Sequence, residues 1–349
     1  MDLRWGVIGY GAWGTHHARA IVETPGAKLF GVATPSEESQ EKARKDFPGI
    51  AVFADYRDLL RCPELEALSI VTPTDLHEEI AVASLEAGKH VLLEKPMALD
   101  EKGCDRILEA VRRSGKTLNV AHEFRFSVQW GAIKKYIDEG RMGDPLYLLI
   151  NLWRRPYRHG REGWRRNFHR VGSWIMEEPI HFFDLALWYF QALGDPIAIF
   201  AQANSRVRAA GFYDNFSAVI RWGSGAYAVI SQTLGGFEHH KSVEFVGTKG
   251  AVRTWWSGPM DRASEASYGM KMIEGLKGGE SFDECIPTEA PLEGKSGEVY
   301  ELRELMKKAI LSIRDGKPLV SGEEGRKAVL LCRQAEEALR AGKEIPLRL

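Results

Sequence analysis

Short apolar runs alternate with amphipathic stretches through the first 122 residues. The apolar runs are bounded by glycine, proline or threonine, which is typical of buried strands. We predict such strands over 3–8, 28–33, 67–71, 91–93 and 117–121. Between them, apolar positions recur at helical spacing, and we predict helices over 15–22, 36–47, 75–87 and 101–113. Repeated strand–helix units predict an α/β domain with a parallel, doubly wound sheet.

The pattern changes after about residue 123. Strands now follow one another with little helix between them, and in 216–222 apolar and polar residues alternate, which is typical of an antiparallel sheet with one buried face. We predict strands at 146–153, 197–207, 216–222, 226–234 and 242–246, helices at 128–139, 297–315 and 323–341, and a long loop at 255–295. The sequence therefore predicts two domains, 1–123 and 124–349.

Composition excludes several classes of protein. The chain has 349 residues, 44% hydrophobic and 27% charged, with a formal net charge of −1, so it is neither disordered nor a nucleic-acid binder held by bulk charge. No apolar run reaches the roughly 18 residues of a membrane span. The N-terminus lacks the pattern of a signal peptide. The four cysteines are far apart, without C-x-x-C, so we expect no disulfide framework, no metal site and a reducing cytoplasm.

A G-x-G-x-x-G turn follows the first strand directly and opens the first helix. The first glycine allows the tight turn, the second lets the backbone approach a pyrophosphate, and the third lets the helix pack on the strand. The pyrophosphate would sit on the helix N-terminus, where free N–H groups and the helix dipole favour anions. The turn therefore predicts dinucleotide binding at Gly9, Gly11, Ala12, Trp13 and Gly14.

The end of the second strand bears on the choice of cofactor. An acidic residue there would bind the ribose 2′-hydroxyl of NAD, but Thr34 stands in that place. Without a carboxylate at this position a 2′-phosphate is not repelled, which admits NADP. No arginine adjoins it, and Glu37 and Glu38 follow closely. Thr34 and Ser36 can bond either cofactor, so both NAD and NADP remain open.

A lysine stands in the turn that ends the strand at 91–93. Lys95, between Glu94 and Pro96, lies at the carboxyl edge of the predicted sheet, where ligands bind in doubly wound folds. Beside a nicotinamide, its ammonium would orient a substrate hydroxyl and ease its deprotonation. The alternative is a surface lysine in a turn.

These motifs together resemble the Gfo/Idh/MocA oxidoreductases, which include inositol dehydrogenases, glucose–fructose oxidoreductase and sugar ketoreductases. The resemblance rests on the glycine turn, Thr72-Pro73 with His77, Gly88-Lys89-His90-Val91, Glu94-Lys95-Pro96, Arg125-Phe126, Trp164-Arg165, the segment around His181 and Val320-Ser321-Gly322-Glu323. It covers nearly the whole chain. It implies a Rossmann domain, followed by a domain whose open antiparallel sheet often forms a dimer or tetramer interface.

The resemblance also implies site residues. Thr72, Pro73, His77, Glu94 and Lys95 join the cofactor site, the Lys95–Pro96 bond is cis, and Arg125, Trp164 and Arg165 contact substrate.

Family members carry an Asp-x-Gly-x-His-x-x-Asp pattern on a helix that lines the site. Here His181 and Asp184 match, Glu177 replaces the first aspartate, and Pro179 replaces the glycine. Positions 177, 181 and 184 would share one helix face. Because proline lacks a backbone donor, the helix could instead begin at Pro179, after an extended lead-in. We predict catalytic roles for Lys95, His181, Glu177 and Asp184, although Asp184 could simply buttress its neighbours.

Residues 153–166 contain six arginines and three aromatic residues. The near-neutral chain argues against nucleic acid. A solvated basic loop or a subunit contact is one reading of this segment. The other is substrate binding, with Trp164 stacked on a sugar face and Arg165 or Arg158 bonded to hydroxyls or an acidic group. We interpret His239-His240 as an exposed strand end rather than a metal site.

These observations predict an NAD(P)-dependent dehydrogenase acting on a secondary hydroxyl of a sugar, glycoside or cyclitol. Lys95 would favour the alkoxide, and His181 would be the general acid and base, oriented by Glu177. A glycosidase or lyase working by transient oxidation uses the same residues, and an extra acid or base such as Tyr157 would favour it. A non-catalytic regulator should lack the lysine or the histidine, and both are present.

Overall fold

The computed structural model describes residues 2–206, 212–263, 265–281 and 284–349. The chain divides into two compact units. The first contains residues 1–123, 169–172 and 302–329, and the second contains 124–168, 173–301 and 330–349. Residues 302–329, which the sequence pattern assigned to the second domain, therefore belong to the first unit.

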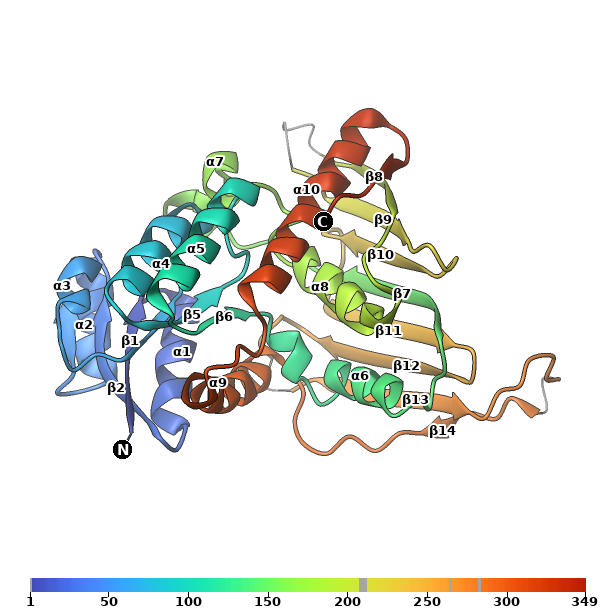
Figure 1. Ribbon diagram of the computed structural model, residues 1–349, viewed down its shortest axis with the longest axis horizontal. Helices are drawn as coiled ribbons and strands as arrows, with labels where there is room; N and C mark the ends of the chain where they lie inside the picture. Colours follow the sequence, from blue (N-terminus) through green and yellow to red (C-terminus); the bar gives the residue numbers. More distant parts are fainter. Residues whose placement is uncertain (1, 207–211, 264, 282–283) are drawn as a thin grey trace. The chain divides into compact units, whose positions relative to one another are not determined.

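The first unit contains a six-stranded parallel sheet in the order β3-β2-β1-β4-β5-β6 (Figure 1). Its strands are β1 (Leu3–Ile8), β2 (Ala27–Ala33), β3 (Ala51–Phe53), β4 (Ala67–Ile70), β5 (His90–Glu94) and β6 (Leu118–Ala121). Strands β4 and β5 are almost wholly buried, and β1 is buried from Trp5 onwards, as expected of a sheet covered on both faces. The predicted doubly wound Rossmann sheet is confirmed.

Helices connect these strands. They are α1 (Ala12–Glu23), α2 (Glu37–Asp46), α3 (Tyr56–Leu60), the 3₁₀ turn η1 (Thr74–Leu76), α4 (His77–Glu86) and α5 (Glu101–Ser114). Helix α5 shows why the ends are sharp. The Asp100 carboxylate accepts a bond from the Gly103 N–H at 2.9 Å, and Gly115 ends the helix at φ +63°.

The late residues of the chain complete this unit at the edge strand β6. The Val120 N–H donates to the Val320 carbonyl at 3.0 Å, and the Leu319 N–H donates to Asn119 Oδ1 at 2.7 Å. A Cβ at Gly322 would lie 2.6 Å from a Leu108 methyl carbon, so glycine allows the chain to lie close to α5. The segment that joins α9 (Glu298–Asp315) to α10 (Gly322–Ala341) therefore covers the β6 edge.

The second unit contains a nine-stranded mixed sheet in the order β14-β13-β12-β11-β7-β10-β9-β8-β15 (Figure 1). Its strands are β7 (Pro145–Trp153), β8 (Ala198–Asn204), β9 (Asn215–Arg221), β10 (Tyr227–Thr233), β11 (His239–Gly247), β12 (Gly250–Gly258), β13 (Ser267–Glu274), β14 (Thr288–Glu289) and β15 (Ile345–Pro346). All neighbours are antiparallel except β7 and β10, so the mostly antiparallel sheet is confirmed.

The prediction of one continuous loop over 255–295 is wrong, because the end of β12, all of β13 and the short β14 lie within it. In β13 the buried side chains are Met270 and Met272, which are not strong strand formers. This strand exists because it pairs with β12 over eight residues, from Gly250 to Ser257, and that context is invisible in a local sequence window.

One face of the second sheet is covered and the other is open. Helix α8 (Pro179–Tyr189) packs on β7 and β10, and the Tyr189 hydroxyl donates to the Trp130 carbonyl of α6 (Trp130–Asp138) at 2.7 Å. Along β9 the residues facing the helices are buried, whereas their alternates are not. Short elements complete the unit or its boundary: η2 (Glu123–Phe126), η3 (Arg161–Arg166), α7 (Phe168–Val171) and η4 (Gln191–Leu193). Among the described residues no helix is long and apolar enough to cross a membrane.

Candidate functional site

The glycine turn lies between β1 and α1, as predicted. Gly9 has φ +94°, and a Cβ there would lie 2.4 Å from the Val71 carbonyl oxygen. A Cβ at Gly14 would lie 2.0 Å from the Gly9 carbonyl oxygen. The first and third glycines are therefore required by the turn itself and by the packing of α1 on β1.

Gly11 differs from both. Its φ of −81° and ψ of −164° suit any residue, and a Cβ there would meet no protein atom within 4 Å. The packing of the protein does not require glycine at this position. Gly11 precedes α1, whose first turn has no side-chain cap and no acidic residue, so its N–H groups at Ala12 and Trp13 are suited to an anion. The residues fit a bound pyrophosphate.

A second observation supports a ligand at this edge. The Thr72 hydroxyl is buried, and it has no hydrogen-bond partner among the residues that the structure describes. Thr72 and Pro73 follow β4, which lies next to β1 and β5. The carboxyl ends of these three adjacent parallel strands thus bring together Gly9, Thr72 and Glu94.

Thr34 is buried at the end of β2. Its N–H donates to the Phe53 carbonyl at 3.0 Å, and its carbonyl accepts from the Gln40 side chain at 3.0 Å. Ser36 caps α2 by accepting from the Ser39 N–H at 3.3 Å. The backbone around Thr34 is therefore held by the protein, and the position carries no carboxylate that would repel a 2′-phosphate.

Glu94 is buried and forms a connected group with residues of α1. Its carboxylate accepts from Trp13 Nε1 at 2.9 Å and from the Lys95 N–H at 3.2 Å, and it contacts His17 Nε2 at 2.9 Å. Burial opposes ionisation, but His17, Lys95 and Trp13 lower the pKa of Glu94. The other ring nitrogen of His17 lies 2.6 Å from the Ser69 hydroxyl. Sequence reasoning missed His17, because 77 residues separate it from Glu94.

His77 contacts the backbone of the turn that contains Lys95. The His77 ring lies 2.7 Å from the Pro96 carbonyl through Nδ1 and 2.9 Å from the Thr72 carbonyl through Nε2. Burial lowers the pKa of His77, although both carbonyls favour its charged form. The Lys95–Pro96 bond is cis, as the resemblance implied, and Lys95 itself is half-buried. His77 thus connects the turns after β4 and β5.

Within the second unit, α8 carries two of the predicted catalytic residues. Pro179 is its first residue, so Glu177 lies in the preceding turn rather than on the helix. The lead-in is a series of turns, not an extended segment. His181 is buried and its ring stacks on Phe124, with centroids 4.4 Å apart.

Asp184 forms a buried bidentate ion pair with Arg125. Arg125 Nε donates to Oδ2 at 2.8 Å and Nη2 donates to Oδ1 at 2.6 Å. The exposed fraction of these side chains is 6% for Arg125 and 1% for Asp184. The guanidinium also lies 5.2 Å from the Trp188 ring centroid. This geometry holds the η2 segment on α8 through strong, charge-assisted bonds.

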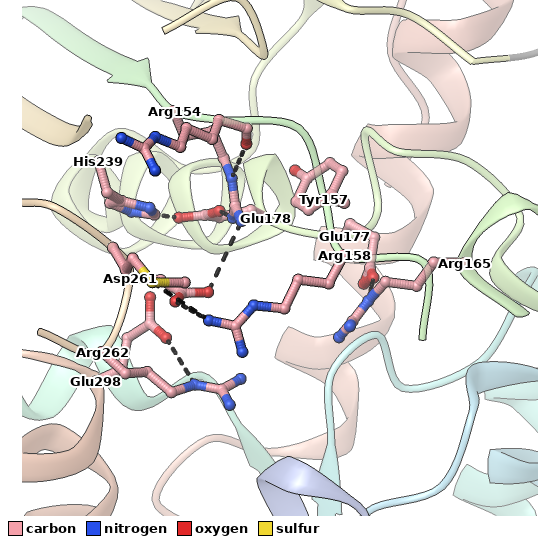
Figure 2. Close-up of polar contacts among 12 residues, drawn as sticks. Arg154, Tyr157, Arg158, Arg165, Glu177, Glu178, His239, Asp261, Arg262 and Glu298 are labelled. Carbon is pink, nitrogen blue, oxygen red and sulfur yellow. Dashed lines mark hydrogen bonds and ion pairs between the residues drawn. The ribbon is translucent and has the colours of Figure 1, made fainter. Parts of the chain in front are cut away.

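Three other predicted residues also come together. The Arg165 guanidinium donates to the Glu177 carboxylate (Figure 2). It also lies 4.9 Å from the Trp164 ring centroid. The Trp174 indole donates to the Arg165 carbonyl at 2.9 Å, which fixes the backbone. A carboxylate, a guanidinium and an indole face thus form one polar and aromatic group in the second unit.

A buried network of charges adjoins this group (Figure 2). The Glu178 carboxylate accepts from Arg154 and lies 3.2 Å from His239 Nε2. Burial opposes the ionisation of Glu178, but Arg154 and His239 hold its pKa well below the usual range. Lys241 lies 3.1 Å from Glu298, and this ion pair with Glu178 nearby raises its pKa against the effect of burial.

The network corrects one prediction. His239 is buried at the start of β11, so the expectation of an exposed strand end is wrong for it. Glu178, His239 and Glu298 offer ligand atoms within 4.8 Å of one another. However, the Lys241 ammonium lies 3.9 Å from Glu178 and 3.1 Å from Glu298. A dication there would meet this fixed positive charge, so the donor set fits an ionic network rather than a metal.

Tyr157 lies against this network. Its hydroxyl donates to Gln232 at 2.9 Å, and the Arg154 guanidinium lies 4.3 Å from its ring centroid. Burial raises the pKa of Tyr157 well above its usual value. A phenol that is buried, bonded and hard to ionise is a poor acid or base at neutral pH.

Two family models match the chain. One, described as an oxidoreductase family with an NAD-binding Rossmann fold, matches residues 3–122, and the other, the GFO/IDH/MocA C-terminal domain, matches 130–253. The chain belongs to the Gfo/Idh/MocA oxidoreductase family. Its first unit is therefore an NAD-binding Rossmann domain, as the glycine turn predicted.

Several relatives align with most or all of this chain. A protein of Thermotoga maritima named myo-inositol 2-dehydrogenase is 25% identical, covering 99% of this chain and 98% of its own. An uncharacterized oxidoreductase of Bacillus subtilis, YrbE, is 30% identical over 76% of this chain and 78% of its own. Among solved structures, the WlbA dehydrogenase of Bordetella pertussis, in complex with NADH and UDP-GlcNAcA, is 25% identical with a TM-score of 0.78, covering 100% of both chains.

Proposed function

We propose that the protein is an NAD- or NADP-dependent dehydrogenase. Its substrate is a sugar, glycoside or cyclitol, and the group that reacts is a secondary hydroxyl or the corresponding ketone. The observation that carries this proposal is the sheet edge of the first unit. There Gly11 leaves open space that the protein does not fill, the Thr72 hydroxyl has no partner among described residues, and Lys95 stands on the next strand end. The relative named myo-inositol 2-dehydrogenase supports the substrate class.

The roles follow from the chemistry of each side chain. When bound, the nicotinamide supplies the hydride acceptor or donor. Lys95 donates a hydrogen bond to the substrate oxygen and stabilises the negative charge that develops on it. His181 takes the hydroxyl proton as general base and returns it in the reverse direction. Glu177, bonded to Arg165, positions polar groups of the substrate, and Trp164 offers a face to a sugar ring.

The test is absorbance at 340 nm with purified protein. NAD and NADP are each offered with a panel of sugars, glycosides and inositols. We expect a rise with one substrate class, a kcat lower by about 10²- to 10⁴-fold in Lys95→Met and in His181→Gln, and unchanged NADH binding by fluorescence. Lys102→Met, an exposed lysine of α5, is the matched control and should keep wild-type activity. A fully active Lys95→Met variant would refute the proposed role.

The second candidate, a glycosidase or lyase that oxidises its substrate transiently, has less support. Its additional acid or base would be Tyr157, and that phenol is buried and bonded to Gln232. Release of chromophore from a nitrophenyl glycoside, with no net rise at 340 nm, would favour this activity instead.

We also propose that the open face of the second sheet pairs with a second copy of the chain. This face presents half-exposed apolar side chains among polar ones, such as Tyr147, Val219, Tyr227, Val229 and Trp255. The Tyr147 and Tyr227 rings contact each other with centroids 5.0 Å apart, and Tyr227 is 41% exposed. Such a face, on a sheet whose other side is covered by helices, is suited to a homodimer or homotetramer interface.

A further inference from the structure

Three arginines of the second unit surround one region beside the buried charge network (Figure 2). They are Arg158, Arg165 and Arg262. Arg158 and the buried Arg154 share Asp261, at 4.0 Å and 3.7 Å, and Arg262 lies 3.9 Å from Glu298. Arg165 donates to Glu177, and the next residue, Glu178, accepts from Arg154, which links Arg165 to the same cluster. Figure 2 draws the guanidinium groups of Arg158, Arg165 and Arg262 in the same part of the view.

The carboxylates near Arg158 and Arg262 have closer cationic partners. Asp261 is nearer to Arg154 than to Arg158, and Glu298 is nearer to Lys241, at 3.1 Å, than to Arg262. Two carboxylates that already contact a buried cation are thus shared with a second, more exposed one. The positive charge of Arg158 is therefore only partly balanced by the carboxylates whose side chains are described.

Arg158 is the least compensated of the three. Its side chain is 59% exposed, and among carboxylates whose side chains are described none comes nearer than 4.0 Å. It donates to the Met260 sulfur at 3.7 Å, which is a weak acceptor. A guanidinium has five donors in a planar fork that matches a carboxylate or a phosphate. An exposed guanidinium with no close carboxylate, beside other positive charges, favours binding of an anion.

We propose that Arg158, flanked by Arg165 and Arg262, binds a carboxylate or phosphate group carried by the substrate. The substrate would then be an acidic sugar or cyclitol derivative rather than a neutral one. This inference rests on the proposed dehydrogenase function, because Arg165 also bonds Glu177 of the predicted catalytic segment. Trp164, stacked on Arg165, would contact the ring of the same substrate.

The test compares matched neutral and acidic substrates. Glucose, glucuronate and glucose 6-phosphate, and inositol with inositol monophosphate, are assayed at 340 nm with both cofactors. We expect kcat/KM at least about tenfold higher for an acidic member than for its neutral partner, since a bond to a charged group contributes more than a neutral one. The uronate and the phosphate separate the two possible sources of the negative charge.

Variants at Arg158 make the test specific. Arg158→Gln should raise KM for the acidic substrate about 10- to 100-fold and leave KM for a neutral one nearly unchanged. Arg158→Lys keeps the charge but loses the planar fork, so we expect an intermediate KM. Arg112→Gln is the matched control, because Arg112 is a 63% exposed arginine on α5 that pairs with Glu109 at 2.7 Å. It should behave as the wild type.

Binding is also measured without catalysis. Isothermal titration of glucuronate and of glucose 6-phosphate into protein saturated with NADH, and separately with NADPH, should show binding that Arg158→Gln abolishes. This result would support the anion site even if no substrate were oxidised. Absence of oxidation would count only against the proposed dehydrogenase function. Turnover of neutral substrates with no preference for acidic ones, an equal rise in KM for both classes in Arg158→Gln, or no binding of either acid would overturn the inference.

Discussion

Replacing Asp184 with asparagine tests whether this residue stabilises the second unit or serves the chemistry directly. Asparagine keeps the shape of the side chain but removes its charge. The Arg125 guanidinium, only 6% exposed, would lose both charge-assisted bonds, of 2.8 Å and 2.6 Å. Breaking a buried ion pair from one side costs about 3–5 kcal/mol, against at most about 1 kcal/mol for an exposed pair. We therefore expect a large loss of stability.

The assay is unfolding in guanidinium chloride followed by tryptophan fluorescence. Of the ten tryptophans, all except Trp5 and Trp13 lie in the second unit, so the signal reports mainly on that unit. Glu344→Gln is the matched control. The Arg221–Glu344 pair is also bidentate, at 2.7 Å and 2.6 Å, but its side chains are 48% and 44% exposed. The control variant should lose less than about 1 kcal/mol.

A double variant separates the ion pair from its burial. Arg125→Met with Asp184→Leu removes both charges. We expect this double variant to lose much less unfolding free energy than Asp184→Asn alone. The reasoning is refuted if Asp184→Asn unfolds within about 1 kcal/mol of the wild type but loses activity. That result would assign Asp184 a direct part in the chemistry.

Three further predictions concern pH, cofactor and assembly. Burial raises the pKa of Glu301 from 4.5 to about 7. The protonated side chain therefore stabilises the folded protein fully below pH 4.5, and this stabilisation is lost as the pH rises through 7. Glu301→Gln should therefore gain about 3 kcal/mol relative to wild type between pH 5 and pH 8 in urea unfolding, and no pH-dependent gap would contradict this. Thr34→Asp should lower kcat/KM with NADP about tenfold or more and spare NAD, measured at 340 nm; equal losses with both cofactors would argue against Thr34 facing the ribose. Light scattering should give a multiple of 39.2 kDa for the wild type, and Tyr227→Lys should reduce it to the monomer; an unchanged mass for the variant would exclude this face as the interface.

An element of the fold was predictable where the hydrophobic pattern and the end residues of its own segment define it. The strand at 3–8 and the helix at 101–113 were predicted within one residue of β1 and α5, because apolar periodicity and end residues agree there. Strand β3 and helix α3 were missed, since three and five residues are too short to show a period. Strand β13 was missed because pairing with β12, not local composition, makes it a strand.

The candidate site divides in the same way. The glycine turn and Lys95 were predictable, because each motif is contiguous and its position after a strand can be inferred from the pattern. The bonds of Glu94 to Trp13 and His17, and of Glu178 to Arg154 and His239, join residues far apart in the chain. A single sequence holds no signal for such pairs.

The pairing of Val320 with Val120 bears on how the protein is made. Residues 302–329 complete the first unit, so its edge strand β6 gains its cover only after the chain has been made as far as about residue 320. Until then β6 presents an open edge, which is prone to pair with other chains. A fragment ending near residue 123 should aggregate for the same reason. Synthesis thus begins the nucleotide-binding unit first but completes it only after residues 124–301, most of which form the second unit.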